Sequence, residues 1–178
     1  MSSPKRFPLV AKVILFQITF LLIHYIYDWF PGPVTFLIGA NSESVFQHMK
    51  VVFFSYILLT VLESGLVGAA IPSLTRFVYS RLLGAVLMPL LMVVFYLSAA
   101  AYVGEWMSIP LEVLFANLAL LAVSTTTFLL EGYFEQLEPS RPLQWALIIL
   151  FVLAASEIVI FNYRLPWFDV FAIPPGWE

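Results

Sequence analysis

Residues 82–104 read LLGAVLMPLLMVVFYLSAAAYVG, a stretch without one charged side chain. A helix needs about 20 mostly apolar residues to cross the hydrocarbon core of a bilayer. Four further apolar stretches of similar length bring the number of predicted spans to five. We therefore predict an all-α fold, a polytopic integral membrane protein with a bundle of about five transmembrane helices in a single membrane domain. The predicted spans cover residues 8–30, 44–71, 82–104, 111–137 and 142–163 of the domain 1–178.

The composition of the whole chain supports the same class. Hydrophobic residues make up 62% and charged residues 11% of its 178 residues, whereas soluble domains average about 45–50% and about 25%. A water-soluble fold of this length could not bury so much apolar surface. The net charge of −3 argues against a nucleic-acid partner. The chain has no Cys, so thiolate metal sites and disulfides are excluded.

Proline and glycine mark the ends of the predicted helices. Pro31-Gly32-Pro33 follows the first span, Pro72 follows the second and Pro110 precedes the fourth. The segment 138–142, Glu-Pro-Ser-Arg-Pro, separates the last two spans. Pro89 falls inside the third span, where we expect it to kink the helix.

The distribution of basic residues predicts an orientation, because cytoplasmic ends carry an excess of Lys and Arg. With five spans, the N-terminal end of the bundle holds six of these residues and the opposite end two. We therefore expect a multi-pass protein of the cell (plasma) membrane with its N-terminus in the cytoplasm and its C-terminus outside. The residues are Lys5, Arg6, Lys12, Arg76, Arg81 and Arg141 at one end, and Lys50 and Arg164 at the other.

Polar residues gather in the predicted outer half of the bundle. Ionisable groups inside a membrane are costly, so each marks a candidate site. His24 and Asp28 lie four residues apart and share one face of the first helix. We expect Ser44 to cap the second helix, with Gln47 three residues later. All five helices contribute to a set that can converge: His24, Asp28, Glu43, His48, Ser98, Asn117 and Glu157.

Glu63 stands apart, in the predicted inner half of the second helix. Hydroxyl residues of the fourth helix reach a similar level, among them Thr126. A hydrogen bond from such a hydroxyl would hold Glu63 neutral, and the two residues would then form an intramembrane relay. Three further acids, nearer the inner surface, are predicted to be a solvated rim. They are Glu131, Glu135 and Glu138.

Two segments of the chain resemble an uncharacterised family of small prokaryotic membrane proteins. Its members end the first helix with H-x-x-x-D, as in HYIYDWFP at 24–31, and open the second with N-E-S-x-W-E-H-x-K, as in ESVFQHMK at 43–50. The Pro- and aromatic-rich C-terminal tail is also similar. The resemblance implies that Glu43, His48 and Lys50 belong to one site, but it implies no reaction. The chain departs from the family pattern at Ser42 for Asn, Phe46 for Trp and Gln47 for Glu.

The sequence leaves three functions open. In the first, the outer polar residues form a His/carboxylate site of an accessory or binding subunit, which joins a partner in a membrane complex or forms a homo-oligomer in the lipid bilayer. In the second, the protein is an enzyme acting on a lipid-like ester or amide. In the third, it is a proton- or cation-coupled transporter that uses Glu63.

The enzyme hypothesis has a metal-dependent and a metal-free form. Two His and one or two carboxylates can bind zinc or iron and leave a position for water. His24, His48, Asp28 and Glu43 are the candidate ligands, and Glu157 is a candidate base. Without a metal, the same five side chains would act by acid–base catalysis. A haem with the two His as axial ligands is a further cofactor to test.

Overall fold

The computed structural model of the protein describes residues 7–67, 71–103 and 108–173. The regular structure within these ranges is helical. Five helices are long and apolar enough to cross a membrane, which confirms the predicted fold class. In chain order the elements are α1 (Leu9–Trp29), α2 (Pro33–Ile38), α3 (Val45–Val67), α4 (Leu74–Val103), α5 (Ile109–Phe134), α6 (Arg141–Tyr163) and the 3-10 turn η2 (Asp169–Phe171).

The start of α4 differs most from the predicted spans. The helix begins at Leu74 rather than at residue 82. The prediction started the span after Arg81 because a charged residue ends an apolar run. In the structure Arg76 and Arg81 lie within the helix, since each forms an ion pair with a glutamate.

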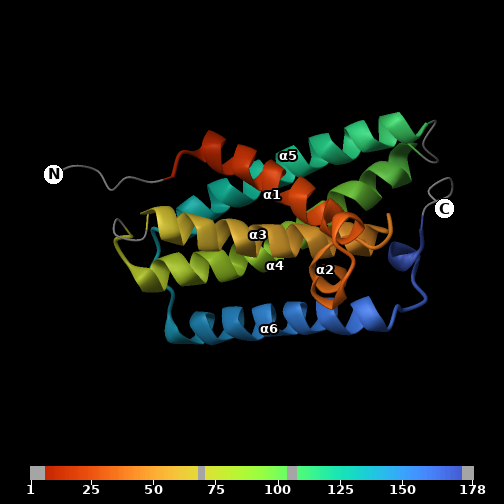
Figure 1. Ribbon diagram of the computed structural model, residues 1–178. Helices are drawn as coiled ribbons and strands as arrows, with labels where there is room; N and C mark the ends of the chain where they lie inside the picture. The colour runs from red at the N-terminus through yellow and green to blue at the C-terminus, as the bar shows by residue number, and fades with distance from the viewer. Residues whose placement is uncertain (1–6, 68–70, 104–107, 174–178) are drawn as a thin grey trace.

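The five long helices form one antiparallel bundle (Figure 1). Contacts between α1 and α3, α3 and α4, α4 and α5, and α5 and α1 close a ring of four helices. The fifth long helix, α6, lies outside this ring and packs mainly against α4. Any site between helices is therefore expected inside the ring of four.

The ring encloses an apolar core. Phe16 of α1, Val51 of α3, Met88 of α4 and Val123 of α5 are each fully buried there. Phe16 and Phe128 meet edge to face with their ring centroids 5.8 Å apart, a favourable aromatic geometry. These contacts fix the distances between the four helices that carry the polar clusters.

The outer surface of the bundle is also apolar. Large hydrophobic side chains such as Leu118, Leu121, Val152 and Ile160 are each about half exposed or more. A continuous apolar surface of this kind is unfavourable in water and favourable in lipid. The chain is thus a multi-pass membrane protein in its architecture as well as in its composition.

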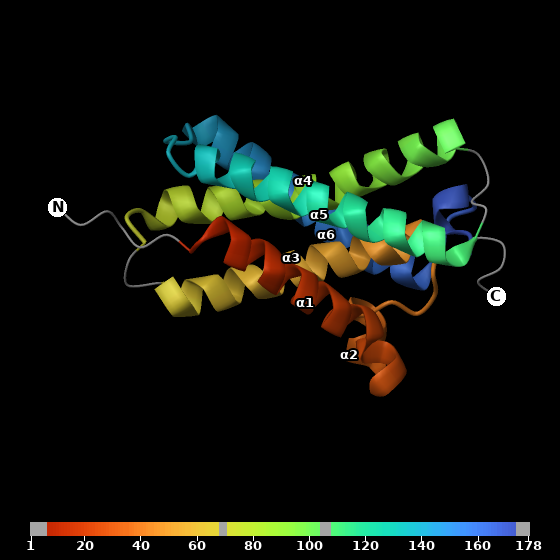
Figure 2. The ribbon, with the colours of Figure 1, turned by 90° about the horizontal axis from the view of Figure 1, so that it is seen from above.

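Proline and glycine shape two places in the bundle. Pro89 lies inside α4, and the two halves of that helix run at an angle to each other (Figure 2). This agrees with the predicted kink, because proline cannot donate the helical hydrogen bond. Gly39 follows α2 where the chain approaches α1 closely. A Cβ atom at Gly39 would lie 2.7 Å from Ile26 Cγ2 and 3.0 Å from the carbonyl oxygen of Ile23.

The antiparallel arrangement brings the end of α1 beside the start of α3. We call the end of the bundle that holds His24 and His48 the histidine end, and the opposite end, with Lys12 and Glu63, the ion-pair end. The twelve residues from Lys12 to His24 correspond to about 18 Å along α1. Each end carries its own polar cluster.

Candidate metal centre

Three side chains from different segments meet at the histidine end. They are His24 of α1, His48 of α3, and Glu43 from the connection that precedes α3, and together we call them the histidine cluster. The two Nε2 atoms lie 3.3 Å apart. Glu43 Oε2 lies 3.7 Å from Nε2 of His24 and 3.4 Å from Nε2 of His48. One potential ligand atom of each side chain therefore faces a common point.

The local sequence positions His48 through the start of α3. Ser44 caps this helix as predicted, because its hydroxyl accepts a hydrogen bond from the backbone N–H of Gln47 at 3.3 Å. The Gln47 side chain does not return to the cap but accepts a bond from the backbone N–H of Asn41 at 3.4 Å. His48 Nδ1 lies 3.0 Å from the carbonyl oxygen of Ser44. A bond donated by Nδ1 there leaves the lone pair of Nε2 directed at the cluster.

The position of His24 depends on α1 and on the chain after α2. His24 is buried on the inner side of α1, and its carbonyl oxygen accepts a bond from the backbone N–H of Ala40 at 3.3 Å. Its ring contacts those of Phe20, Tyr25 and His48. Its Nδ1 atom is buried without a hydrogen-bond partner among the described residues.

The geometry of the cluster fits a metal ion. Zn²⁺ with bonds of about 2.0–2.2 Å to nitrogen and oxygen in tetrahedral geometry places neighbouring ligand atoms about 3.3–3.6 Å apart. The three separations in the histidine cluster, 3.3, 3.4 and 3.7 Å, match this spacing closely. Two imidazoles and one carboxylate also suit Fe²⁺. Three protein ligands leave a fourth position, which is the pattern of catalytic rather than structural zinc sites.

A cavity of about 140 Å³ lies beside the histidine cluster. Its walls come from α1, α3, α4 and α5, and apolar side chains such as Phe20, Met92 and Leu120 line most of it. On the α4 and α5 side Tyr96 donates a hydrogen bond to Glu112, and both residues line the cavity. The cavity therefore has the histidine cluster on one wall and a hydroxyl–carboxylate pair on another.

Glu112 and Tyr96 were not among the site residues predicted from the sequence. Both lie on helices that reach the histidine end, and Glu112 is in the first turn of α5. The depth of an ionisable residue could have identified Glu112, since the first turn of α5 and the last turns of α1 lie at the same end. Tyr96 gave no comparable indication, because a tyrosine in an apolar span usually marks packing.

The structure leaves four of the predicted outer residues outside the histidine cluster. Asp28 is exposed although it lies one turn after His24. One turn after His24 on α1 corresponds to the start of the antiparallel α3, so Asp28 lies level with the beginning of that helix. Ser98 and Glu157 are exposed on α4 and α6. Asn117 is exposed too, but it lines the cavity beside the cluster.

Lys50 is buried, and its hydrogen bonds are made away from the histidine cluster. Its Nζ atom donates to the carbonyl oxygen of Phe36 at 3.0 Å and to Oδ1 of Asn162 at 2.7 Å. These contacts tie α3 to α2 and α6. The histidine cluster forms without it, and Lys50 does not line the adjacent cavity.

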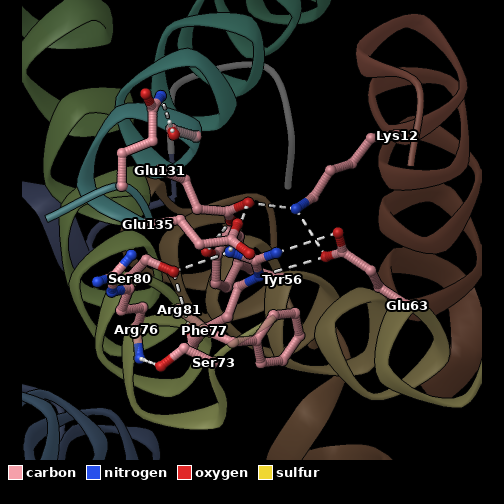
Figure 3. A network of polar contacts seen from close by, with 12 residues as sticks. Lys12, Tyr56, Glu63, Ser73, Arg76, Phe77, Ser80, Arg81, Glu131 and Glu135 are labelled. Atoms are coloured by element: carbon pink, nitrogen blue, oxygen red, sulfur yellow. Dashed lines mark hydrogen bonds and ion pairs between the residues drawn. The ribbon is translucent and has the colours of Figure 1, made fainter. Parts of the chain in front are cut away.

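A second polar cluster occupies the ion-pair end, and Figure 3 shows it at close range. Lys12 Nζ lies 2.7 Å from Glu63 Oε2 and also bonds Glu131. Arg81 Nη2 lies 3.0 Å from Glu63 Oε1, and Arg81 Nη1 lies 3.0 Å from Glu131 Oε1 and 3.3 Å from Glu135 Oε2. The Tyr56 hydroxyl donates to Glu131. We call these six residues the ion-pair network.

The ion-pair network corrects the prediction for Glu63. The carboxylate of Glu63 is bound by two cations, Lys12 and Arg81, and not by a hydroxyl of α5. Thr126 is exposed on α5, so the predicted relay of Glu63 and Thr126 does not form. The prediction that Glu131 belongs to a solvated rim is wrong, because this residue is only 4% exposed. A buried carboxylate is stable here because the cations of two other helices lie beside it.

Comparisons with protein families, with curated proteins and with solved structures found no match for this chain.

Proposed function

We propose that this protein is a membrane-embedded metalloenzyme that binds one divalent transition-metal ion through His24, Glu43 and His48. The observation that carries the proposal is the spacing of the three ligand atoms, 3.3–3.7 Å, around one point at the edge of a cavity. Zn²⁺ is the first candidate ion and Fe²⁺ the second.

The open coordination position supports a hydrolytic reaction on a lipid-like ester or amide. His24, Glu43 and His48 would hold the ion, which would supply polarisation of the substrate carbonyl and an activated water. In such a hydrolysis a C–O bond to water would replace the C–O or C–N bond of the substrate, and a proton of that water would pass to the leaving oxygen or nitrogen. Glu112, held by Tyr96, is a carboxylate on the cavity wall that can take part in this proton transfer.

Other cofactors and the transport hypothesis receive less support. A cavity of about 140 Å³ is close to the 150 Å³ that holds benzene, so it does not fit a haem. Glu63 is bound by two cations, which favours a structural role over a proton relay. The histidine cluster therefore supports a functional site better than Glu63 does.

The experiment that tests the proposal is the metal content of detergent-purified protein, measured by elemental mass spectrometry. The wild type should hold close to one zinc or iron per chain, and His24→Ala, His48→Ala and Glu43→Gln should each lose most of it. Replacing the ion by Co²⁺ should give a visible spectrum of tetrahedral cobalt that the three variants lack. Glu157→Gln, which changes an exposed carboxylate of α6, is the matched control and should keep the metal. A wild type that stays metal-free after incubation with zinc and iron would refute the proposal.

One observation favours a second function, that of a subunit in a membrane complex. Glu157 is exposed on the lipid-facing surface of α6, about 9 Å from the end of that helix. Its side chain leans towards the N-terminus of α6, which directs it away from the nearer membrane surface. Such a carboxylate is stabilised by a polar group of a neighbouring helix. A partner that co-purifies in mild detergent, and is lost with Glu157→Leu but not with Glu43→Gln, would support this function.

The orientation of the protein also stays a proposal. Lys12, Arg81 and Lys50 are buried, so they say little about the side on which each end lies. Among the described residues, Arg76 and Arg141 at the ion-pair end still outnumber Arg164 at the histidine end and favour a cytoplasmic N-terminus. Lys5 and Arg6, which the prediction also counted, lie outside the described residues.

A further inference from the structure

We propose that the cavity beside the histidine cluster binds the head of a single-chain fatty amide that enters sideways from the bilayer, between α1 and α5. The inference names the substrate class of the proposed metal site. It rests on the proposed function only for the contact between the head and the metal ion. The path into the cavity and the binding of the chain follow from the helices alone.

The rim of the cavity identifies the path. Leu21 and Tyr25 of α1, and Val113 and Asn117 of α5, line the cavity and are also exposed on the outer surface of the bundle. In both views α1 and α5 diverge towards the histidine end (Figure 1; Figure 2). The cavity therefore opens between these two helices, and a molecule dissolved in the hydrocarbon region can reach it without crossing water.

The size of the cavity limits the ligand. An apolar cavity of about 150 Å³ holds a group as large as benzene, and this cavity measures about 140 Å³. It therefore accepts a polar head with the first few carbons of one chain, while the rest of the chain stays in the bilayer. A lipid with two chains joined by a glycerol backbone is too large for it.

The polar groups on the cavity walls determine which head group of a ligand fits there. The ion at the histidine cluster offers a position for a carbonyl oxygen. Glu112 accepts a hydrogen bond from the Tyr96 hydroxyl, and carboxylate oxygens can accept more than one such bond. A head that bonds both walls needs a carbonyl oxygen and an N–H donor close together, and an amide supplies both. The apolar side chains of Phe20, Met92 and Leu120 then surround the first carbons of the chain.

Photo-crosslinking tests the proposal directly. The probe is a fatty amide with a diazirine next to the amide group and an alkyne at the chain end, added to the zinc-loaded full chain in phosphatidylcholine nanodiscs. Crosslinked residues are mapped by mass spectrometry. We expect crosslinks to concentrate on the cavity-lining parts of α1, α4 and α5, well above those on the exposed face of α6.

A pair of tryptophan variants provides the matched control. Ala116→Trp fills the cavity from α5, whereas Leu150→Trp adds the same side chain to the exposed face of α6. Loss of the burial of about two methylene groups should lower crosslinking in the cavity about tenfold in the first variant. Leu150→Trp should show the same crosslinking in the cavity as the wild type. Because Ala116→Trp can fail to fold, unlabelled fatty amide is also tested on the wild type, where an excess should suppress the cavity crosslinks.

Three outcomes separate this inference from the proposed function. Uniform labelling of all five long helices, or labelling that an excess of unlabelled amide does not suppress, would overturn the inference even if zinc is bound. Cavity labelling in a protein that binds no metal would support the inference and refute the metal site. Suppression by phosphatidic acid as strong as that by the amide would also overturn the inference, because it would show that the site selects a two-chain lipid.

Discussion

Both polar clusters include residues of α1 and α3, yet they differ in how far their polar atoms are satisfied. At the ion-pair end Lys12 and Arg81 oppose Glu63 and Glu131, with each charge paired to at least two others or to a hydroxyl. At the histidine end three ligand atoms face one point beside a cavity, and the second ring nitrogen of His24 lacks a partner among the described residues.

We assign the two clusters different roles because their polar atoms are satisfied to different extents. A buried charge network whose members satisfy one another has little left to bind, and removing one member leaves the others unpaired. At the histidine end the three ligand atoms contact one another beside a cavity, at separations that an ion between them would also fit. We therefore interpret the ion-pair network as the element that holds α1, α3, α4 and α5 together, and the histidine cluster as the site that works on a ligand.

The largest expected effect is the loss of stability in Arg81→Leu. This change leaves the carboxylates of Glu63 and Glu131 buried with one cation fewer, which should lower the free energy of unfolding by about 3–5 kcal/mol. The matched control is Arg76→Leu, because Arg76 pairs with the exposed Glu138 and such a pair contributes about 0–1 kcal/mol. The measurement is unfolding in mixed micelles with increasing denaturing detergent. Equal losses in the two variants would contradict the role assigned to the network.

An intermediate effect is expected where α4 approaches Tyr56. A Cβ atom at Gly84 would lie 2.1 Å from the Tyr56 hydroxyl oxygen, so Gly84→Ala must displace a fully buried ring and its bond to Glu131. Overpacking of this kind costs about 1–3 kcal/mol. Gly65→Ala is the control, since nothing lies within 4 Å of the added atom. In the same unfolding assay the control should be as stable as the wild type or slightly more stable.

The smallest expected effect is that of removing a helix cap at each end of the bundle. Ser44 caps α3 at the histidine end and Ser73 caps α4 at the ion-pair end, each by accepting a backbone N–H bond. Replacing either by Ala should lower stability by about 1 kcal/mol. Zinc affinity, measured by competition with a chelator, should fall in Ser44→Ala by less than the about 10–100-fold of a lost ligand-orienting bond, because His48 Nδ1 contacts the backbone oxygen of Ser44, which Ala keeps, and should stay unchanged in Ser73→Ala. Equal affinities in both variants would show that the α3 cap does not support His48.

The fold could be predicted from the sequence because the bilayer requires long apolar helices. Five runs of the right length and their proline boundaries gave the spans to within a few residues. The main error was at α4, where Arg76 and Arg81 were taken as the end of an apolar run. Whether such a residue ends a helix or lies within it depends on partners from distant segments, here Glu138 for the partly exposed Arg76 and Glu63 for the buried Arg81.

The candidate site could be predicted only in part. Depth along each helix placed His24, Glu43 and His48 at one end of the bundle, but it also placed Asp28 and Glu157 there. Which of them converge depends on the rotation of each helix about its axis, and packing rather than apolar periodicity sets this rotation when both faces of a helix are apolar. For the same reason the sequence missed the burial of Lys12 and Glu131 beside Glu63.

The measurement that tests the central claim most directly is the increase in the free energy of unfolding on addition of zinc, compared between Glu43→Gln and Glu63→Gln. Binding to the folded state alone adds about 2.7 kcal/mol when free zinc is 100 times its dissociation constant. We expect Glu63→Gln to be less stable than the wild type without zinc but to keep this increase. Glu43→Gln should keep its stability without zinc and lose the increase. An increase that survives in Glu43→Gln, or one that is lost in folded Glu63→Gln, would contradict the separation of the two ends.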